Sequence, residues 1–232
     1  MKDKFKPDFK AAHQAANVIL TRSHEIKSFP CDIISHIKEE TDIKLVSYGT
    51  ARRRYGLVIS CLGSEDALIV EDKGRYIIFY NERAYESRKK WSIAHEMGHF
   101  YLGHNLDSKN ISEELRSKQE IEANFFAAQL LMPDAVIWKL VDLYHLEINE
   151  KFLEMKFAVS AEASRKRLET LNKMFDYRNS REAVEEAETI VIKFAEFINS
   201  LKPQNYYGYS SLEDEEELQK ERDTWNYRKR YR

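Results

Sequence analysis

One short stretch of the 232-residue chain carries residue types that could bind a metal ion and activate water. The stretch 91–100 contains His95, Glu96 and His99 in the pattern His-Glu-x-x-His. On a helix, side chains four residues apart project from one face, so both imidazoles can bind one Zn²⁺. Glu96 is turned about 100° from His95, since a helix has 3.6 residues per turn, and can act on a water as a general base. The motif therefore predicts a metal-dependent hydrolase.

A catalytic zinc ion needs a third protein ligand and an open fourth position. A third histidine in the order His-Glu-x-x-His-x-x-Gly-x-x-His is not available, because Gly103 and His104 miss that register. We interpret His104 as a helix-end residue. The other route is a carboxylate from a second helix, and Glu120 is the candidate, on one face with Asn124. Glu122 points elsewhere on that helix and stays the alternative ligand.

The surroundings of the ligands can also be read from this second helix. Asn124 is placed to hold a metal-bound histidine through its second ring nitrogen, as groups around metal ligands commonly do. Small residues would let the second helix approach the first closely: Ala123, Ala127 and Ala128. Peptide hydrolysis also needs a group that stabilises the oxyanion. The candidates for that role, by residue type alone, are His104, Tyr80, Tyr101 and His145.

Helices and one small sheet are expected to position these residues, which makes the fold class α+β. Helical periodicity predicts helices over 9–41 (broken at Pro30), 87–102, 112–132 and 182–201, and two or three shorter ones within 134–174. Strand-like stretches at 43–48, 56–62, 67–70 and 75–80 predict a small, mostly antiparallel sheet. If the last strand lies at an edge, it can pair with an extended substrate. From residue 203 the chain turns polar, which predicts a loosely attached tail.

Composition restricts the class of protein. Hydrophobic residues make up 43% of the chain, enough for a sizeable core, and only 7 Gly and 4 Pro argue against an all-β sandwich or barrel. The net charge of −2 provides no global field toward nucleic acid or a membrane. The polar start is not a signal peptide, and no apolar run approaches the ~20 residues of a membrane span. Cys31 and Cys61 are expected to be reduced, half-buried thiols of a cytoplasmic protein.

Three blocks of the sequence, at 29–34, 92–99 and 120–133, resemble the ImmA/IrrE family of zinc metallopeptidases in the same order. The resemblance extends over roughly residues 9–174. It implies a minimal zincin core of the thermolysin-like (gluzincin) type, with the metal held by His95, His99 and Glu120. It also implies a cytoplasmic protease that cleaves a helix-turn-helix repressor and so derepresses mobile-element or stress genes. We accordingly expect a peptidase domain at 1–174 and a helical extension with a polar tail at 175–232, in an unknown oligomeric state.

A second signal lies at the end of the predicted peptidase domain. The segment 150–174 resembles a helix-turn-helix, with Ser160 as N-cap of its second helix and Arg165, Lys166 and Arg167 presented together. DNA is therefore a second candidate partner, although packing against the peptidase core is the simpler interpretation. The competing function is a non-catalytic zinc-binding transcription regulator or toxin–antitoxin component that acts through protein or DNA binding. Glu96→Gln would separate the two classes, because Glu96 is not an expected metal ligand.

Overall fold

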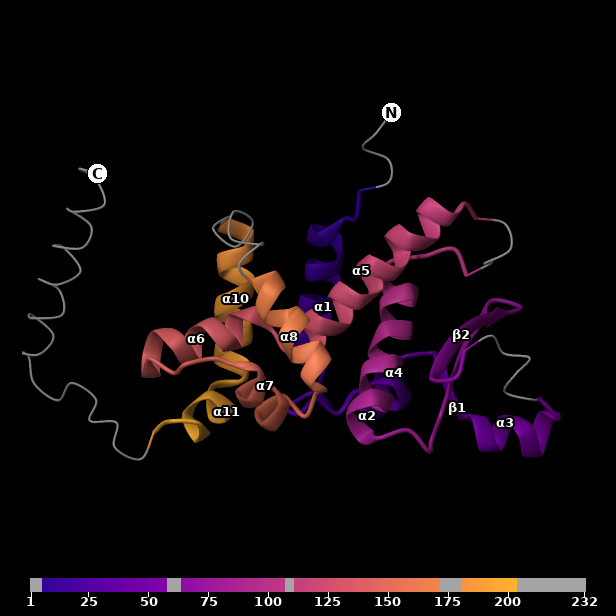
Figure 1. Cartoon of the computed structure of the whole chain (residues 1–232), viewed down its shortest axis with the longest axis horizontal. Coiled ribbons are helices and arrows are strands. Elements are labelled where there is room, and N and C mark those ends of the chain that lie inside the picture. The colour runs from indigo at the N-terminus through magenta and orange to yellow at the C-terminus, as the bar shows by residue number, and fades with distance from the viewer. Residues whose placement is uncertain (1–5, 58–63, 107–110, 172–180, 204–232) are drawn as a thin grey trace, which may run out of the picture. The chain divides into compact units, whose positions relative to one another are not determined.

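The computed structural model describes residues 6–57, 64–106, 111–171 and 181–203 (Figure 1). The helices and strands in this part of the chain are α1 (Phe9–Arg22), α2 (Ile33–Glu40), β1 (Lys44–Ser47), α3 (Tyr48–Tyr55), β2 (Ala67–Asp72), β3 (Arg75–Tyr80), α4 (Glu86–Tyr101), α5 (Glu113–Leu131), α6 (Asp134–Tyr144), α7 (Glu150–Phe157), α8 (Ala161–Leu171), α10 (Arg181–Lys193) and α11 (Ala195–Ser200). All of them belong to one compact unit, Met1–Ser200. The α+β fold class is confirmed, with helices from Arg181 to Ser200 at the C-terminal end of the unit.

The two helices that carry the predicted site residues begin and end close to the expected positions. Helix α5 starts after Ser112, whose hydroxyl accepts a hydrogen bond from the N–H of Leu115 at 3.2 Å, and it ends before Pro133. Helix α4 is followed by Gly103, whose φ of 62° is a left-handed conformation that glycine adopts without strain. Local sequence signals therefore determine where both helices stop.

Within the described residues, the sheet has three strands in the order β1-β3-β2, and it is mixed. β1 runs parallel to β3, with Leu45 opposite Ile78, whereas β2 runs antiparallel to it, with Ile69 opposite Ile78. β3 is therefore the central strand, and the expectation that residues 75–80 could form a substrate-binding edge is wrong. β1 pairs with one side of β3 and β2 with the other, so neither side of β3 can pair with a substrate. The predicted strand at 56–62 lies largely outside the described residues, and α3, which directly follows β1, was not predicted.

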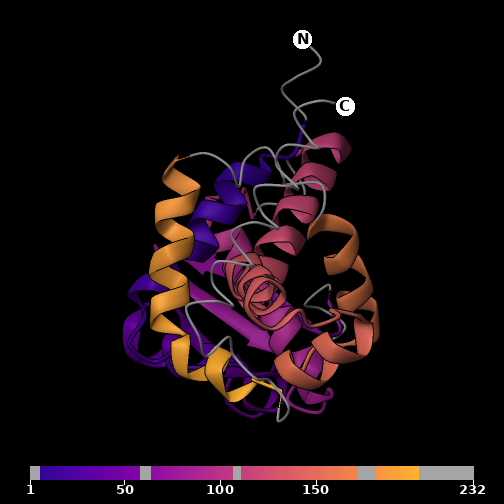
Figure 2. The same cartoon turned by 90° about the vertical axis from the view of Figure 1, so that its left-hand side faces the viewer.

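The sheet and the other helices pack around α4 and α5, the two helices that carry the predicted site residues. α4 packs against β2 and β3 on one side and against α5 on another, and α1 packs on α5 (Figure 1). Figure 2 shows α10 running beside α1, which it contacts along with α6. Fully buried side chains fill the layer between the helices, among them Ile93 and Met97 of α4 and Phe126 of α5. The site is thus built on two helices whose facing side chains are fully buried.

Arg167 corrects the helix-turn-helix interpretation. Ser160 does cap α8, since its Oγ accepts a hydrogen bond from the N–H of Ala163 at 3.2 Å. Arg167 of α8, however, is only 2% exposed, and its Nε donates to the carbonyl oxygen of Met132 at 2.9 Å. Its Nη2 donates to the side chain of Gln129. The expectation that three basic side chains are presented together is therefore wrong for Arg167, because its guanidinium ties α8 to the end of α5.

Other expectations concern single residues and boundaries. Cys31 is fully buried rather than half-buried, its thiol donates to the carbonyl oxygen of Leu130 at 3.4 Å, and burial raises its pKa. Cys61, the domain boundary at 174 and the tail from 204 lie outside the described residues and stay predictions. Within the described ranges, no helix combines the length and apolarity needed to cross a membrane.

Candidate metal centre

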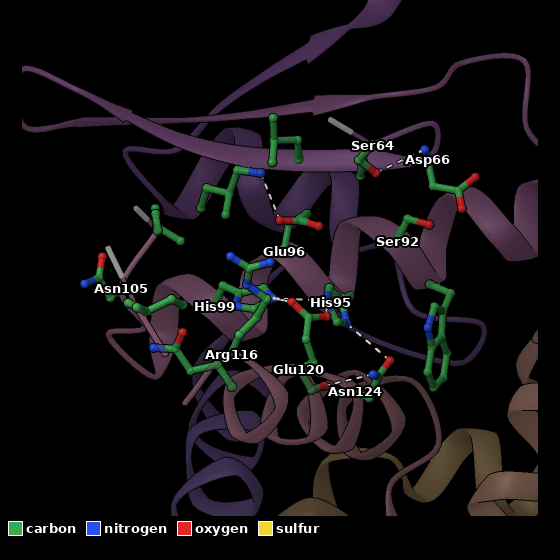
Figure 3. A pocket seen from close by; sticks show the side chains of 17 residues that line it. Ser64, Asp66, Ser92, His95, Glu96, His99, Asn105, Arg116, Glu120 and Asn124 are labelled. Carbon is green, nitrogen blue, oxygen red and sulfur yellow. Dashed lines mark hydrogen bonds and ion pairs between the residues drawn. The ribbon is translucent and has the colours of Figure 1, made fainter. Parts of the chain in front are cut away.

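Two helices bring three metal-binding side chains together. His95 and His99 extend from successive turns of α4, with their Nε2 atoms 3.0 Å apart. Glu120 extends from α5, and its carboxylate oxygens lie 3.2 Å from Nε2 of His95 and 3.5 Å from Nε2 of His99 (Figure 3). One atom from each residue lies within 4.8 Å of the other two. The residues predicted as ligands thus converge at one point.

Asn124 determines which nitrogen of His95 faces this point. The amide nitrogen of Asn124 donates to the backbone carbonyl of Glu120 at 2.8 Å, which directs its Oδ1 toward Nδ1 of His95 at 3.2 Å (Figure 3). A carbonyl oxygen can only accept, so His95 carries its proton on Nδ1. Nε2 is therefore the nitrogen of His95 that faces Glu120 and that a metal ion would take in place of its proton.

The donor set fits a divalent transition metal ion, which we infer from the chemistry of the converging atoms. Two imidazole nitrogens and one carboxylate oxygen form a set of three protein ligands that catalytic zinc sites use, with the fourth position left to water or substrate. All three groups are held on helices, and the Gly98–Ala123 contact brings these helices close: a Cβ on Gly98 would meet Cα of Ala123 at 3.0 Å. The predicted close approach of the two helices is present at this point, where Gly98 lies against the backbone of Ala123; the role predicted for the side chains of Ala123, Ala127 and Ala128 stays a prediction.

Electrostatics favours the ligand forms of two of these side chains. Burial and the neighbouring His95 lower the pKa of His99, which keeps its imidazole neutral. The hydrogen bond with His95 lowers the pKa of Glu120 despite its partial burial. Burial also acts to lower the pKa of His95, but Glu120 and Glu96 outweigh it and raise that pKa. The carboxylate of Glu120 is therefore favoured in its ionised form beside a neutral His99, as a metal ligand set needs.

Glu96 lies on the neighbouring face of α4, beneath β2. It is only 8% exposed, and its Oε2 accepts a hydrogen bond from the backbone N–H of Ile69 at 2.8 Å. Burial raises the pKa of Glu96, and the charge of Glu120 adds to this, although His95 opposes it. A carboxylate with a raised pKa is a stronger base. Glu96 is thus positioned apart from the ligand atoms but within the same cleft.

A cleft of about 580 Å³ opens over these residues, between β2, α4 and α5. Its lining includes Arg116, which sequence reasoning missed and which extends from α5 (Figure 3). A signal was present, because Arg116 lies four residues before Glu120 and so shares its helix face. The four residues proposed for the oxyanion do not line this cleft: His104, Tyr80, Tyr101 and His145. The hydroxyl of Tyr101, for example, lies 3.4 Å from Nε2 of His36 instead.

Glu122, the alternative ligand, lies away from the three converging atoms. Its side chain is 7% exposed, and its Oε2 contacts Nε2 of His104 at 3.1 Å. His104 in turn places its Nδ1 2.9 Å from Nδ1 of His99. Among the described side chains, these two therefore approach the centre from behind His99.

Comparison with known proteins agrees with this geometry. Residues 52–169, about half of the chain, match the peptidase family M78, described as the IrrE N-terminal-like domain. Metallopeptidase ImmA of Bacillus subtilis (strain 168) is 33% identical over 81 residues, which are 33% of this chain and 47% of that protein. The match thus spans about half the length of this curated relative. The chain belongs to the IrrE N-terminal-like family of metallopeptidases.

Proposed function

We propose that this protein is a cytoplasmic, zinc-dependent metallopeptidase with Glu96 as its catalytic base. The observation that carries the proposal is the convergence of His95, His99 and Glu120 in one cleft with Glu96. Zn²⁺ held by these three residues would supply Lewis acidity toward the scissile carbonyl and the attacking water. Membership of a metallopeptidase family supports peptide bonds as the substrate class.

Glu96 handles the protons of the reaction. Its carboxylate takes a proton from the attacking water as the new carbon–oxygen bond forms. It then gives the proton to the leaving nitrogen as the carbon–nitrogen bond breaks, so the products are a carboxylate and an amine. The hydrogen bond from the N–H of Ile69 holds Oε2 in place during both transfers.

The outer edge of β2 is proposed to bind the substrate backbone. Because the N–H of Ile69 points to Glu96, the backbone groups of Ile69 face away from β3 and toward the cleft. Alternate residues of a strand share this direction, so Ala67 presents its groups on the same side. An extended peptide could add as a further strand there through the carbonyl of Ile69 and the backbone groups of Ala67, since Glu96 takes the N–H of Ile69, with its scissile bond over the metal centre. β2 thus takes the role that the sequence suggested for residues 75–80.

Arg116 is proposed to stabilise the oxyanion. It lines the cleft from the same face of α5 as Glu120, and a guanidinium is a permanent cation with several donors. Charge that develops on the carbonyl oxygen of the substrate would be stabilised by such a group.

The natural substrate is proposed to be a helix-turn-helix repressor, whose cleavage would derepress mobile-element or stress genes. This step rests on the resemblance of the three sequence blocks to ImmA/IrrE proteins. The test is to incubate the zinc-loaded protein with the soluble proteins of its host cells and to identify new N-termini by mass spectrometry. New N-termini that depend on Glu96 and fall in a helix-turn-helix protein would support the proposal.

Two other results would overturn parts of it. If Glu96→Gln generates the same new N-termini, the peptidase assignment fails, because the proposed base is not needed. If cleavage depends on Glu96 but affects only proteins without a helix-turn-helix, the peptidase stands and the repressor assignment fails.

A further inference from the structure

A chain of hydrogen-bonding side chains runs from the protein interior to the back of His99. Glu122 contacts Nε2 of His104 at 3.1 Å, and Nδ1 of His104 lies 2.9 Å from Nδ1 of His99. Both outer members are buried, with side-chain exposures of 5% for His104 and 7% for Glu122. Nε2 of His99 then faces Glu120 and His95. We infer that Glu122 and His104 are positioning residues that fix the metal-binding tautomer of His99; the inference deepens the proposed function and rests on it.

The direction of each hydrogen bond follows from Glu122. An ionised carboxylate can only accept, so His104 must carry a proton on Nε2 to donate to it. In a neutral imidazole the other nitrogen is then bare, so Nδ1 of His104 accepts. Its partner, Nδ1 of His99, must therefore carry the proton of that ring. Nε2 of His99 is left with a free lone pair directed at the metal centre.

Glu122 is itself held in this orientation. Its other oxygen, Oε1, accepts a hydrogen bond from the backbone N–H of Asp8 at 2.5 Å and lies 3.7 Å from Nζ of Lys118. The backbone donor and the nearby ammonium group on the side of Oε1 leave Oε2 to accept from His104. The N–H of Asp8, just before α1, thus holds the carboxylate that in turn orients His104 and His99.

The local fold explains why His104 reaches His99 although it follows the helix. Gly103 adopts a φ of 62° and reverses the chain, and the N–H of His104 donates to the carbonyl oxygen of His99 at 3.0 Å. This turn folds the imidazole back against the last turn of α4. His104 is thus the helix-end residue that the sequence suggested, and its imidazole in addition contacts His99 from behind.

The opposite hydrogen-bond direction would prevent metal binding at His99. If Nδ1 of His104 donated, Nδ1 of His99 would accept and its proton would move to Nε2. The bare Nε2 of His104 would then face the carboxylate of Glu122, acceptor against acceptor. The charge of Glu122 selects against this arrangement.

Glu122→Gln tests the inference with an almost isosteric change. The amide oxygen should keep the hydrogen bond from the N–H of Asp8 and the side that faces the ammonium of Lys118, so the amide NH₂ group turns toward His104. Nε2 of His104 must then accept, which reverses both histidines and moves the proton of His99 to Nε2. In the metal-free protein, ¹⁵N NMR of the imidazoles should report Nδ1–H for His99 in the wild type and Nε2–H in the variant. The affinity for Zn²⁺, measured against a competing chelator, should fall about 10- to 100-fold.

Two further variants separate this effect from general damage. His104→Asn keeps an acceptor near the position of Nδ1 and should retain most of the affinity, whereas His104→Leu removes it and should not. Glu40→Gln is the matched control, because Glu40 contacts Nδ1 of His36 at 2.7 Å in a pair outside the metal centre. It should leave the affinity for Zn²⁺ and the tautomer of His99 unchanged.

The inference is overturned if His99 of the wild type carries its proton on Nε2, or if Glu122→Gln binds Zn²⁺ as tightly as the wild type. These readouts need no catalysis, so they distinguish this inference from the proposed function. A protein with the predicted tautomers whose cleavage products do not depend on Glu96 would retain the inference about His99 and lose the peptidase.

Discussion

Gly98 of α4 lies directly against the backbone of Ala123 of α5: a Cβ built on Gly98 would meet Cα of Ala123 at 3.0 Å and its carbonyl oxygen at 3.1 Å. Gly98 directly precedes His99 in sequence, and Ala123 follows Glu120 by three residues, so the contact lies beside two of the proposed ligands. The spacing of the two helices at this point therefore sets the distance between the ligands that they carry.

Gly98→Ala should weaken metal binding by separating the helices. The added methyl meets backbone atoms and the ring of Phe126 at 3.2 Å, so α5 must shift. We expect a loss of about 1–3 kcal/mol in the free energy of unfolding of the metal-free protein. We also expect a loss of affinity for Zn²⁺ of at least about tenfold, measured by chelator competition.

Gly74→Ala is the control for this substitution. Gly74 has a φ of 77° with no atom near its Cβ position, so alanine there brings backbone strain without a clash. It should lower stability by about 1 kcal/mol and leave metal affinity unchanged. Equal metal affinity in Gly98→Ala and Gly74→Ala would show that the helix contact does not control the site.

Arg167 should contribute to stability rather than to DNA binding. Arg167→Ala removes a buried cation and leaves Met132 O, Gln129 and the nearby Asp134 without it, which should cost about 3–5 kcal/mol in urea unfolding. Arg165 is exposed and pairs with Glu169 on its own helix, so Arg165→Ala should change stability by less than about 0.5 kcal/mol. Similar small effects from both changes would contradict the buried role of Arg167.

Acid should destabilise the protein partly through Asp134. Burial alone would raise the pKa of this carboxyl, but the hydrogen bond with His13 at 3.0 Å and the charges of His13 and Arg167 lower it below its ordinary value. A depressed folded-state pKa gives stability that is complete above about pH 4 and is lost as the pH falls further. Asp134→Asn should therefore have lower stability at pH 7 and a smaller further loss toward pH 3.

The measurement is urea unfolding of the metal-free protein between pH 3 and pH 7, which avoids the effect of metal dissociation. Glu169→Gln, at an exposed position, is the control and should follow the wild type. An Asp134→Asn variant that loses as much stability on acidification as the wild type would show that another group dominates the acid response.

Arg116→Met should impair cleavage without removing the metal. If Arg116 stabilises the oxyanion, its loss should lower kcat about 10²-fold and change KM little. The zinc content should stay at the wild-type value, since Arg116 is not a ligand. Arg52→Met, at an exposed position of α3, is the control. A rise in KM at unchanged kcat would assign Arg116 to substrate binding instead.

Local signals carried much of the prediction, and contacts between distant elements account for what it missed. The four-residue spacing of His95 and His99 and the helix face of Glu120 are local features, and the structure brings these residues together. The central position of β3 depends on β1, which pairs with it from about thirty residues away in sequence. No local pattern shows that pairing.

The burial of polar side chains could not be predicted from local sequence patterns either. From the sequence, Arg167 is expected to be a surface cation, whereas in the structure it is hydrogen-bonded to Gln129 and Met132 of another segment. His104 is a helix-end residue as expected, but its sequence position does not show that the turn at Gly103 brings its imidazole against His99. The residues that contact Arg167 lie on or at the end of another helix, and the residue that contacts His104 lies across a turn. The sequence gives the type of each residue but does not show which residues contact it in the fold.

Metal analysis of the purified protein and three variants tests the central claim most directly. We predict one equivalent of zinc in the wild type and in Glu96→Gln, and none in His99→Ala or Glu120→Ala, with all four proteins folded by circular dichroism. One equivalent of zinc retained by a folded Glu120→Ala or His99→Ala variant would contradict the proposed centre.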